Sequence, residues 1–299
     1  MPVSQATKIL YHKIMTRLGV HTSIAGGIYK SLERAHELGC TTMQIFSHNP
    51  RGWALKYISG EDRTLFRKLK RELDIRPVFI HTSYLINLAS PSDELFRKSI
   101  GLLKEEMNRA DAISADFVVL HTGSASGEDK KIARQRAIKG LKEVFKNRKW
   151  GAGLLLENTA GERGDITSEI TELAEVMDRV NGRISGICID TCHAFAAGYD
   201  IRAKKGIDKF LEEIERYIGI DKLKLIHLND SKGELGSHRD RHEHIGLGKI
   251  GIKGFEEFFT QVPFSNVPLI LETPKKADKD DIRNLKKAKK ILQRQIGYY

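Results

Sequence analysis

The sequence predicts a single closed (β/α)8 barrel, the TIM-barrel fold, over most of its 299 residues. Short apolar runs of strand-forming residues alternate with amphipathic helical segments, and eight such pairs follow one another between residues 17 and 293. The strand starts are mostly about 25 to 45 residues apart, which is the spacing that parallel strands with helical crossovers require. No Ser/Pro-rich linker or change in composition divides the chain. Eight units favour a closed barrel over an open sheet.

Each predicted strand is a run of apolar and β-branched residues that stops at a polar residue or a turn signal. Val20, Ile45 and Val118 to Leu120 are typical of these runs. In chain order, the strands are expected at 17–21, 42–46, 77–81, 117–121, 153–157, 184–190, 223–228 and 268–272. The segment 191–199 is expected to be a loop of small residues, and 230–248 a long polar loop.

Each predicted helix carries apolar residues three and four positions apart. In the third helix, Ser92 suits the N-cap position, and Ile100, Leu103 and Met107 repeat on one face. In the last, charge-dense helix, Leu285 and Leu292 still keep helical spacing. In chain order, the helices are expected at 24–38, 61–73, 92–113, 130–147, 167–179, 207–218, 252–260 and 280–293.

Composition limits the class of protein. Hydrophobic residues make up 40% of the chain, as in ordinary globular proteins, and no run approaches the roughly 18 apolar residues of a membrane span. Residues 1–14 lack the apolar core of a signal peptide, so we expect a cytoplasmic protein. We expect residues 1–14 to be an accessory extension and residues 15–299 to form the barrel.

The charge balance and the three cysteines constrain partners and chemistry. Fifty Lys and Arg residues against 39 Asp and Glu give a net charge of +11, which favours a polyanionic partner such as nucleic acid. A charge-rich surface with no such partner is the alternative. An odd number of cysteines argues against a disulfide framework. The Cys188 and Cys192 spacing is compatible with metal binding, but without a second cysteine pair we interpret both as reduced thiols.

Ionisable residues recur where the predicted strands end. In a barrel these positions lie on one face, where active sites are built. Five imidazoles and four carboxylates brought together without partners would carry severe desolvation and repulsion costs, which bound metal ions would remove. The candidate metal ligands are His81, His121, Glu157, Asp190, His193, His227, Asp240, His242 and Glu272.

The donor types indicate which metal and which reaction. Imidazole with carboxylate suits zinc, with manganese or iron as alternatives, and nine ligands are enough for two or three ions. Closely spaced divalent ions lower the pKa of a bridging water and hold both oxygens of an in-line displacement. The sequence therefore predicts a metal cluster suited to phosphodiester hydrolysis.

Long motifs make a family resemblance specific. The chain resembles the endonuclease IV family of zinc-dependent apurinic/apyrimidinic endonucleases (deoxyribonuclease IV) from about residue 16 to residue 292. The motifs that carry the resemblance are GVHTSIAGG at 19–27, HTSYLINL at 81–88, LLENTAG at 155–161, GICIDTCHAFAAGY at 186–199, HLND at 227–230, DRH at 240–242 and LET at 271–273.

The resemblance implies three zinc ions in a TIM barrel. It assigns His81, His121 and Glu157 to the first ion, with Glu157 bridging to a second ion that Asp190, His227 and Glu272 complete. The third ion, which grips the scissile phosphate, is assigned to His193, Asp240 and His242. The implied reaction is attack of a bridging hydroxide on the phosphorus 5′ to an abasic site in duplex DNA, which leaves a 3′-hydroxyl and a 5′-deoxyribose phosphate.

The resemblance also assigns residues that contact DNA. Tyr84 and Leu85 match residues that enter the minor groove at the lesion, and Arg51 matches an arginine that inserts into the base stack. Taken alone, Tyr84 and Leu85 could equally be packing residues of a loop, and Arg51 an ordinary exposed charge. His21 is expected to lie beside the cluster without binding an ion, where it would orient ligands or close the barrel floor. We expect a monomer.

Two other classes of function remain open on the residues alone. A metal-dependent sugar isomerase or epimerase would also place His and carboxylate ligands at strand ends, but it predicts two oxygen-rich metal positions and gives no reason for the surplus positive charge. A DNA-binding module with structural zinc would have a closed site, usually rich in thiolates, which differs from this pattern. Incision of a duplex with one abasic analogue, with and without chelator, would separate these readings.

Overall fold

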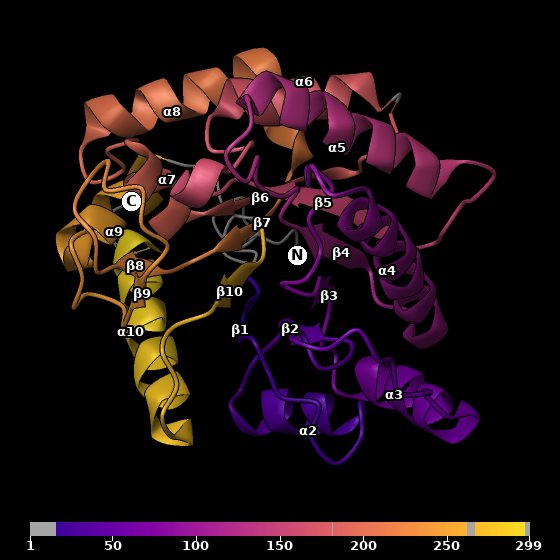
Figure 1. Ribbon diagram of the computed structural model, residues 1–299. Helices are drawn as coiled ribbons and strands as arrows, with labels where there is room; N and C mark the ends of the chain where they lie inside the picture. Colours follow the sequence, from indigo (N-terminus) through magenta and orange to yellow (C-terminus); the bar gives the residue numbers. More distant parts are fainter. Residues whose placement is uncertain (1–15, 181, 262–266, 297–299) are drawn as a thin grey trace, which may run out of the picture.

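Eight parallel strands form the centre of the computed structural model, which describes residues 16–180, 182–261 and 267–296. Their spatial order is β1-β10-β7-β6-β5-β4-β3-β2, so neighbours along the chain are mostly neighbours in the sheet, and helices surround the ring (Figure 1). The predicted (β/α)8 barrel is confirmed. The eight strands are β1 (Leu18–Val20), β2 (Met43–Phe46), β3 (Val78–His81), β4 (Phe117–Leu120), β5 (Gly153–Glu157), β6 (Gly186–Asp190), β7 (Leu223–His227) and β10 (Leu269–Leu271).

Apart from one additional helix directly after β6, the helices that cover the strands agree with the sequence except at some ends. Ser92 caps its helix as expected, because its hydroxyl accepts a hydrogen bond from the Leu95 N–H at 3.3 Å. The helices are α2 (Lys30–Glu37), α3 (Gly60–Glu72), α4 (Asp93–Ile113), α5 (Lys130–Phe145), α6 (Ile170–Arg179), α7 (Thr191–Ala197), α8 (Lys204–Tyr217), α9 (Gly251–Gln261) and α10 (Asp278–Ile296).

Three local expectations were wrong. The helix expected from residue 24 begins only at Lys30, because Gly26 and Gly27 have φ values of +82° and +132°, which a helix does not accommodate. The segment expected to be a loop after β6 forms α7, which Asp190 caps by accepting the His193 N–H at 2.8 Å. The long polar loop contains a short antiparallel pair, β8 (Asp230–Ser231) and β9 (His242–Glu243).

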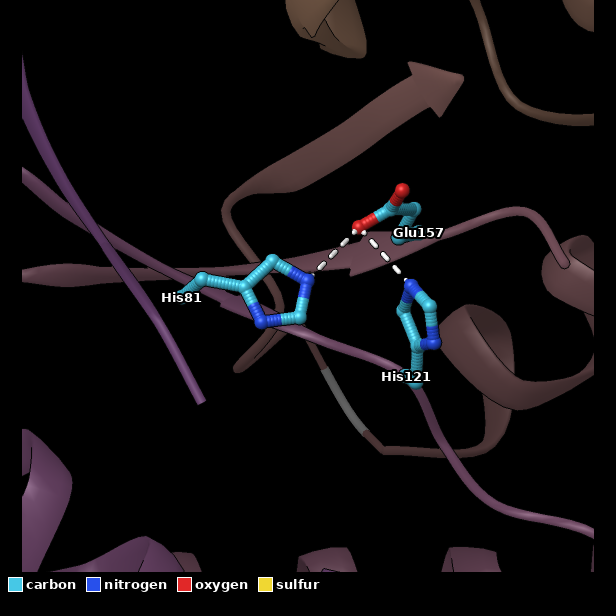
Figure 2. Close-up of side chains that lie close together, drawn as sticks. All are labelled: His81, His121 and Glu157. Carbon is cyan, nitrogen blue, oxygen red and sulfur yellow. Dashed lines mark ion pairs between the residues drawn. The ribbon is translucent and has the colours of Figure 1, made fainter. Parts of the chain in front are cut away.

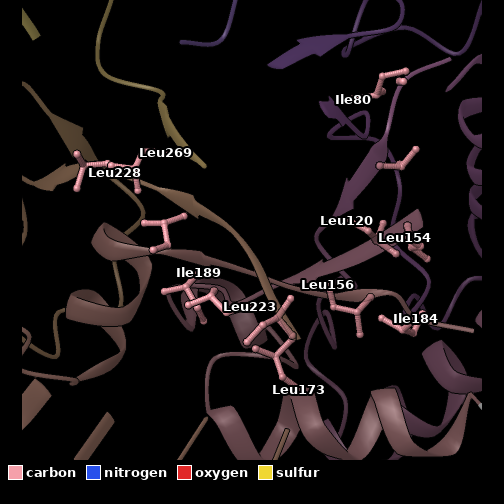
Figure 3. Packing of buried hydrophobic residues seen from close by; sticks show 14 of the residues in the cluster. Ile80, Leu120, Leu154, Leu156, Leu173, Ile184, Ile189, Leu223, Leu228 and Leu269 are labelled. Carbon is pink, nitrogen blue, oxygen red and sulfur yellow. The ribbon is translucent and has the colours of Figure 1, made fainter. Parts of the chain in front are cut away.

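Side chains along the strands alternate between two apolar layers. The residues facing outward pack against the helices, and several of these contacts are drawn in Figure 3. The alternate residues fill the inside of the ring as a separate cluster of Phe79, Val119, Leu155, Cys188, Leu225 and Ile270. Because side chains in a strand repeat every two residues, the position two residues further along each strand also faces the barrel axis.

One junction of the ring is thinner than the others. In the described parts of the chain, β1 and β2 meet through a single parallel bridge between His21 and Gln44, whereas the other neighbouring strands form ladders of two or more residue pairs. Two backbone hydrogen bonds accompany this bridge, from the Thr22 N–H to the Gln44 carbonyl at 2.8 Å and from the Thr41 N–H to the Leu18 carbonyl at 3.0 Å.

Other features of the chain follow the composition. Cys40, Cys188 and Cys192 are free and buried, and burial raises the pKa of Cys188 to about 12, which keeps it a thiol. No helix in the described ranges is long and apolar enough to cross a membrane. The proposed extension over residues 1–14 lies outside the described residues.

Candidate metal centre

The alternation of the strands places the candidate ligands at one end of the barrel. His81, His121 and Glu157 each stand two positions beyond an apolar residue of the inner layer, and so face the axis at the carboxyl ends of β3, β4 and β5. Asp190, His227 and Glu272 repeat this relation at β6, β7 and β10. His193 comes from α7, and Asp240 and His242 come from the segment between β8 and α9.

The first group of donor atoms surrounds one carboxylate oxygen. Figure 2 shows the imidazoles of His81 and His121 both pointing at Glu157. Their Nε2 atoms lie 3.3 Å and 3.1 Å from Glu157 Oε2. Glu157 is fully buried, and the three donor atoms lie within 4.8 Å of one another. Two nitrogens and one oxygen therefore converge on a small common space.

A second group shares Glu157 through its other oxygen. His227 Nδ1 lies 2.9 Å from Glu157 Oε1 and 3.2 Å from Glu272 Oε2. Asp190 Oδ2 is 4.0 Å from the same nitrogen. One buried carboxylate thus contacts both groups, which is the position that a bridging ligand would occupy.

The third group lies nearer the rim. His193 Nε2 and His242 Nε2 are 3.1 Å and 3.3 Å from Asp240 Oδ1. His242 Nε2 is also 3.5 Å from Asp190 Oδ2, so this group adjoins the second. The Asp240 side chain is 42% exposed, whereas that of His193 is 2% exposed. The third group therefore contains the most exposed donor of the cluster, and His121 of the first group, at 32% exposed, comes next.

The donor atoms are those that a metal would need. His81 and His193 donate their Nδ1–H groups to the carbonyls of Thr82 and Asn158, at 2.8 Å and 2.9 Å, which leaves Nε2 free to act as a ligand. Several buried atoms that face the cluster have no hydrogen-bond partner in the described structure, namely His121 Nε2, Glu157 Oε2, His193 Nε2 and His242 Nε2. Buried imidazole nitrogens and carboxylate oxygens that lack hydrogen bonds are suitable ligands for divalent metal ions.

The charged groups of the cluster stabilise one another's ionised forms. Burial alone would raise the pKa of Glu157, but the imidazoles of His227 and His121 outweigh it and hold that pKa well below its ordinary value. Burial alone would lower the pKa of His193, but Asp190 and Asp240 raise it well above the usual range. Glu157 thus stays ionised, and a metal ion that binds His193 would have to displace a proton from its imidazole.

Sequence reasoning missed the amides that orient the ligands. Gln44 is fully buried on β2, where its Nε2–H donates to Glu272 Oε1 at 2.6 Å and its Oε1 accepts from His227 Nε2 at 2.8 Å. Asn229 donates to Asp190 Oδ2 at 2.6 Å. His21 Nδ1 accepts from Gln44 at 3.1 Å and lies 3.5 Å from Glu272 Oε1, beside the cluster as expected. Gln44 lies in the inner layer of the barrel, where the other strands place apolar residues. A polar residue at such a position in the sequence could have indicated its role beside the ligands.

A further carboxylate holds the segment that carries Asp240 and His242. Asp230 is fully buried and accepts hydrogen bonds from backbone N–H groups on both sides of that segment. These donors belong to Ser231, Gly246, Gly248, Ile250 and Gly251. The absence of a side chain at Gly248 is required, because a Cβ there would lie 2.5 Å from Asp230 Oδ1.

Replacing Asp230 with alanine should loosen this segment. Several N–H groups would lose their partner, at a cost of about 1–3 kcal/mol for each that stays buried. We expect the free energy of unfolding to fall by roughly 3 kcal/mol and trypsin to cleave faster after Arg239 and Arg241. Denaturant unfolding and limited proteolysis would measure both, with the exposed Asp221→Ala as control. Unfolding and cleavage rates equal to those of the unsubstituted protein would contradict this role.

The residues expected to contact DNA stand on two neighbouring loops at the same end of the barrel. Tyr84, which follows β3, is 63% exposed, and its ring lies edge-on to Phe46 with centroids 5.2 Å apart. Leu85 is half-buried, and Arg51, on the loop after β2, is exposed. A cavity of about 1010 Å³ opens between the loops after β1 and β2, where Pro50 and Gly52, the neighbours of Arg51, and His21 and His48 contribute to its wall.

The chain resembles known proteins over most of its length. Residues 32–295 match the model of a family described as xylose isomerase-like TIM barrels. A probable endonuclease 4 of Halothermothrix orenii is 46% identical over 267 residues, which cover 88% of this chain and 95% of the relative. One from Aquifex aeolicus is 41% identical and covers 93% and 99% of the two chains.

Solved structures separate the family from the wider fold. The crystal structure of endonuclease IV from Thermus thermophilus is 34% identical with a TM-score of 0.82, over 93% of this chain and 99% of that one. A D-tagatose 3-epimerase-like protein has a TM-score of 0.68 at 18% identity, which shows the barrel fold alone. The probable endonuclease 4 proteins are 46% and 41% identical to this chain over nearly their whole length. This similarity, together with the barrel and the cluster at its strand ends, establishes that this chain belongs to the endonuclease 4 family.

Proposed function

We propose that this protein is a zinc-dependent DNA-repair endonuclease that hydrolyses the phosphodiester bond 5′ to abasic sites in duplex DNA. The products would be a 3′-hydroxyl and a 5′-deoxyribose phosphate. The observation that carries the proposal is the cluster of imidazole and carboxylate atoms around Glu157, several of which have no hydrogen-bond partner, in a chain that resembles proteins named endonuclease 4. Membership of the endonuclease 4 family supports a nucleic-acid substrate, and the cluster of metal-ligand residues supports hydrolysis as the reaction.

Three zinc ions fit the three groups of donors. His81, His121 and Glu157 would hold the first, and His193, Asp240 and His242 the third. The second would share Glu157 and take the remaining ligands, Asp190, His227 and Glu272. Bound there, the ions would lower the pKa of a water and neutralise the charge of the phosphate. His21 would stay behind the ligands without binding an ion.

The protein's own residues would prepare the site for this reaction. Glu157 keeps two donor groups within reach of one another because its two oxygens face different imidazoles. Gln44 and Asn229 fix the orientation of His227 and Asp190, which reduces the rearrangement needed on binding. Asp240, the most exposed donor of the third group, would meet the scissile phosphate first.

Binding to DNA would combine a general and a specific contribution. The net charge of +11 favours contacts to phosphate that are independent of sequence and weaken with salt. Tyr84, Leu85 and Arg51 would enter the duplex at the lesion, where a missing base lowers the cost of unstacking. We propose that the protein acts as a monomer.

Incision of a defined duplex tests the proposal. One strand would carry a single tetrahydrofuran abasic analogue and be labelled at its 5′ end, and an intact duplex would serve as control. We expect cleavage only of the abasic strand, immediately 5′ to the analogue, with a 3′ end that a DNA polymerase extends. A ketohexose incubated with the same preparation would test the alternative, a metal-dependent sugar isomerase or epimerase. Epimerised sugar without incised DNA would overturn the proposal.

Shortening Tyr84 and Leu85 to alanine should reduce lesion preference. The two side chains together would fill the space of one missing base, and a base-sized stacking contact contributes about 1–3 kcal/mol, so the ratio of abasic to intact affinity should fall roughly 5- to 150-fold. Affinity for intact duplex and metal content should hardly change, since neither side chain belongs to the cluster. Measuring both affinities at two salt concentrations separates lesion recognition from phosphate contact. An unchanged ratio would show that these residues only pack the loop.

A further inference from the structure

A buried carboxylate on α4 connects the two loops that are proposed to contact DNA. Glu106 is fully buried and lies on the helix that follows the loop after β3. Its Oε1 accepts the Ser83 N–H at 2.9 Å, and its Oε2 accepts the Ser47 hydroxyl at 2.7 Å. Ser83 directly precedes Tyr84, and Ser47 begins the loop that carries Arg51.

Further contacts bind the two loops to each other and to the same helix. Ser83 Oγ donates to the Pro50 carbonyl at 2.7 Å and accepts the Leu85 N–H at 3.2 Å. His48 Nε2 lies 3.0 Å from Glu106 Oε1. One buried carboxylate therefore has partners on both loops.

One turn further along α4, Arg109 donates hydrogen bonds to the loop after β2 at two points. Its Nε donates to Ser47 Oγ at 3.1 Å, and one terminal nitrogen donates to the Lys56 carbonyl at 2.8 Å. The loop after β2 is thus fixed near both of its ends, with the exposed Arg51 between them. The proposed active-site mechanism uses neither Glu106 nor Arg109.

We propose that Glu106 is a positioning residue for lesion recognition, holding the Arg51 loop and the Tyr84–Leu85 loop in fixed relative placement. This inference rests on the proposed function. The loops after β2 and β3 would contact the same lesion, so the distance between them must be kept. Hydrogen bonds from both loops to one carboxylate on a helix supply that constraint. Without it, each loop would retain its DNA-contacting side chain but would lose order before binding, which weakens specific recognition.

Replacing Glu106 with alanine tests this role. We expect the ratio of abasic to intact-duplex affinity to fall on the order of tenfold, which is within the range for one lost stacking contact. Metal content and affinity for intact duplex should stay within about twofold, since the phosphate contacts are retained. The neighbouring Glu105→Ala, which removes an exposed carboxylate from the same turn, is the matched control and should leave the ratio unchanged.

The ratio separates positioning from simple destabilisation. A variant that is only partly folded loses both affinities by the same factor, which leaves the ratio unmoved. If Glu106→Ala gives no cooperative unfolding transition, Ser47→Ala takes its place, because it removes the hydroxyl that joins the loop after β2 to Glu106 and leaves the Ser83 N–H bonded to the same carboxylate. A smaller fall in the ratio is expected for Ser47→Ala.

The two possible failures are distinguishable. If the unsubstituted protein prefers the abasic duplex and the tested variant keeps the full preference, the positioning role is overturned and the proposed function stands. If the unsubstituted protein shows neither preference nor incision, the proposed function itself fails, and the inference fails with it.

Discussion

Replacing Glu157 with glutamine is expected to lower the rate of incision by several orders of magnitude. Glu157 Oε2 faces His81 and His121, and Oε1 faces His227, so one charge stands between two groups of donors. An amide keeps the shape but removes the charge that would hold two cations together. Positioning of the nucleophile and stabilisation of the transition-state charge are each worth roughly 10²–10³ in rate. Single-turnover cleavage of the abasic duplex would measure the loss.

The accompanying binding measurement makes the Glu157 result specific. DNA affinity should survive far better than turnover, because the residues proposed to contact phosphate and the lesion are other than Glu157. Glu143→Gln, an exposed carboxylate on α5, makes the same chemical change away from the cluster and should be silent. Turnover of Glu157→Gln close to that of this control would show that the bridging assignment is wrong.

Removing bound metal is expected to abolish incision completely. The three donor groups predict between two and three zinc ions per chain in the purified protein, measurable by elemental analysis. Prolonged chelation should remove them together with the activity, and zinc added back to the dialysed protein should restore both. The melting temperature should also fall, since ions that bind only the folded state stabilise it by mass action. A fully active preparation that contains no metal would contradict the mechanism.

Most of the barrel could be predicted because the signals are local. Strand runs such as 153–157 end at the residue where the structure ends β5, and Ser92 caps α4 as its position suggested. The errors have local causes as well. α7 was missed because its small residues lack an apolar stripe, and its cap, Asp190, had been interpreted only as a ligand. The delayed start of α2 follows from two glycines in the left-handed region.

The candidate site could be predicted only as far as its ionisable residues. A carboxylate or imidazole at a strand end is visible in a sequence, and the period of two brings such positions to one axis. Gln44 and Asn229 carry no charge, and Glu106 lies on a helix, so each looks like an ordinary polar residue. What gives them a role is contact between segments: Gln44 meets His227, and Glu106 meets Ser47. Such pairs depend on tertiary packing that no single stretch of the sequence records.

The single bridge between β1 and β2 affects how easily the barrel opens locally. Where few backbone hydrogen bonds join two strands, local opening costs less free energy than in the longer ladders. The bridge residues, His21 and Gln44, also contact Glu272, and Gln44 contacts His227. An ion that binds only when these groups are in place would lower the population of the open form by the factor 1 + [ion]/Kd. Closure of the barrel and metal binding are then coupled equilibria. Among the amides of the eight strands, those of β1 and β2 should exchange fastest when no ion is bound.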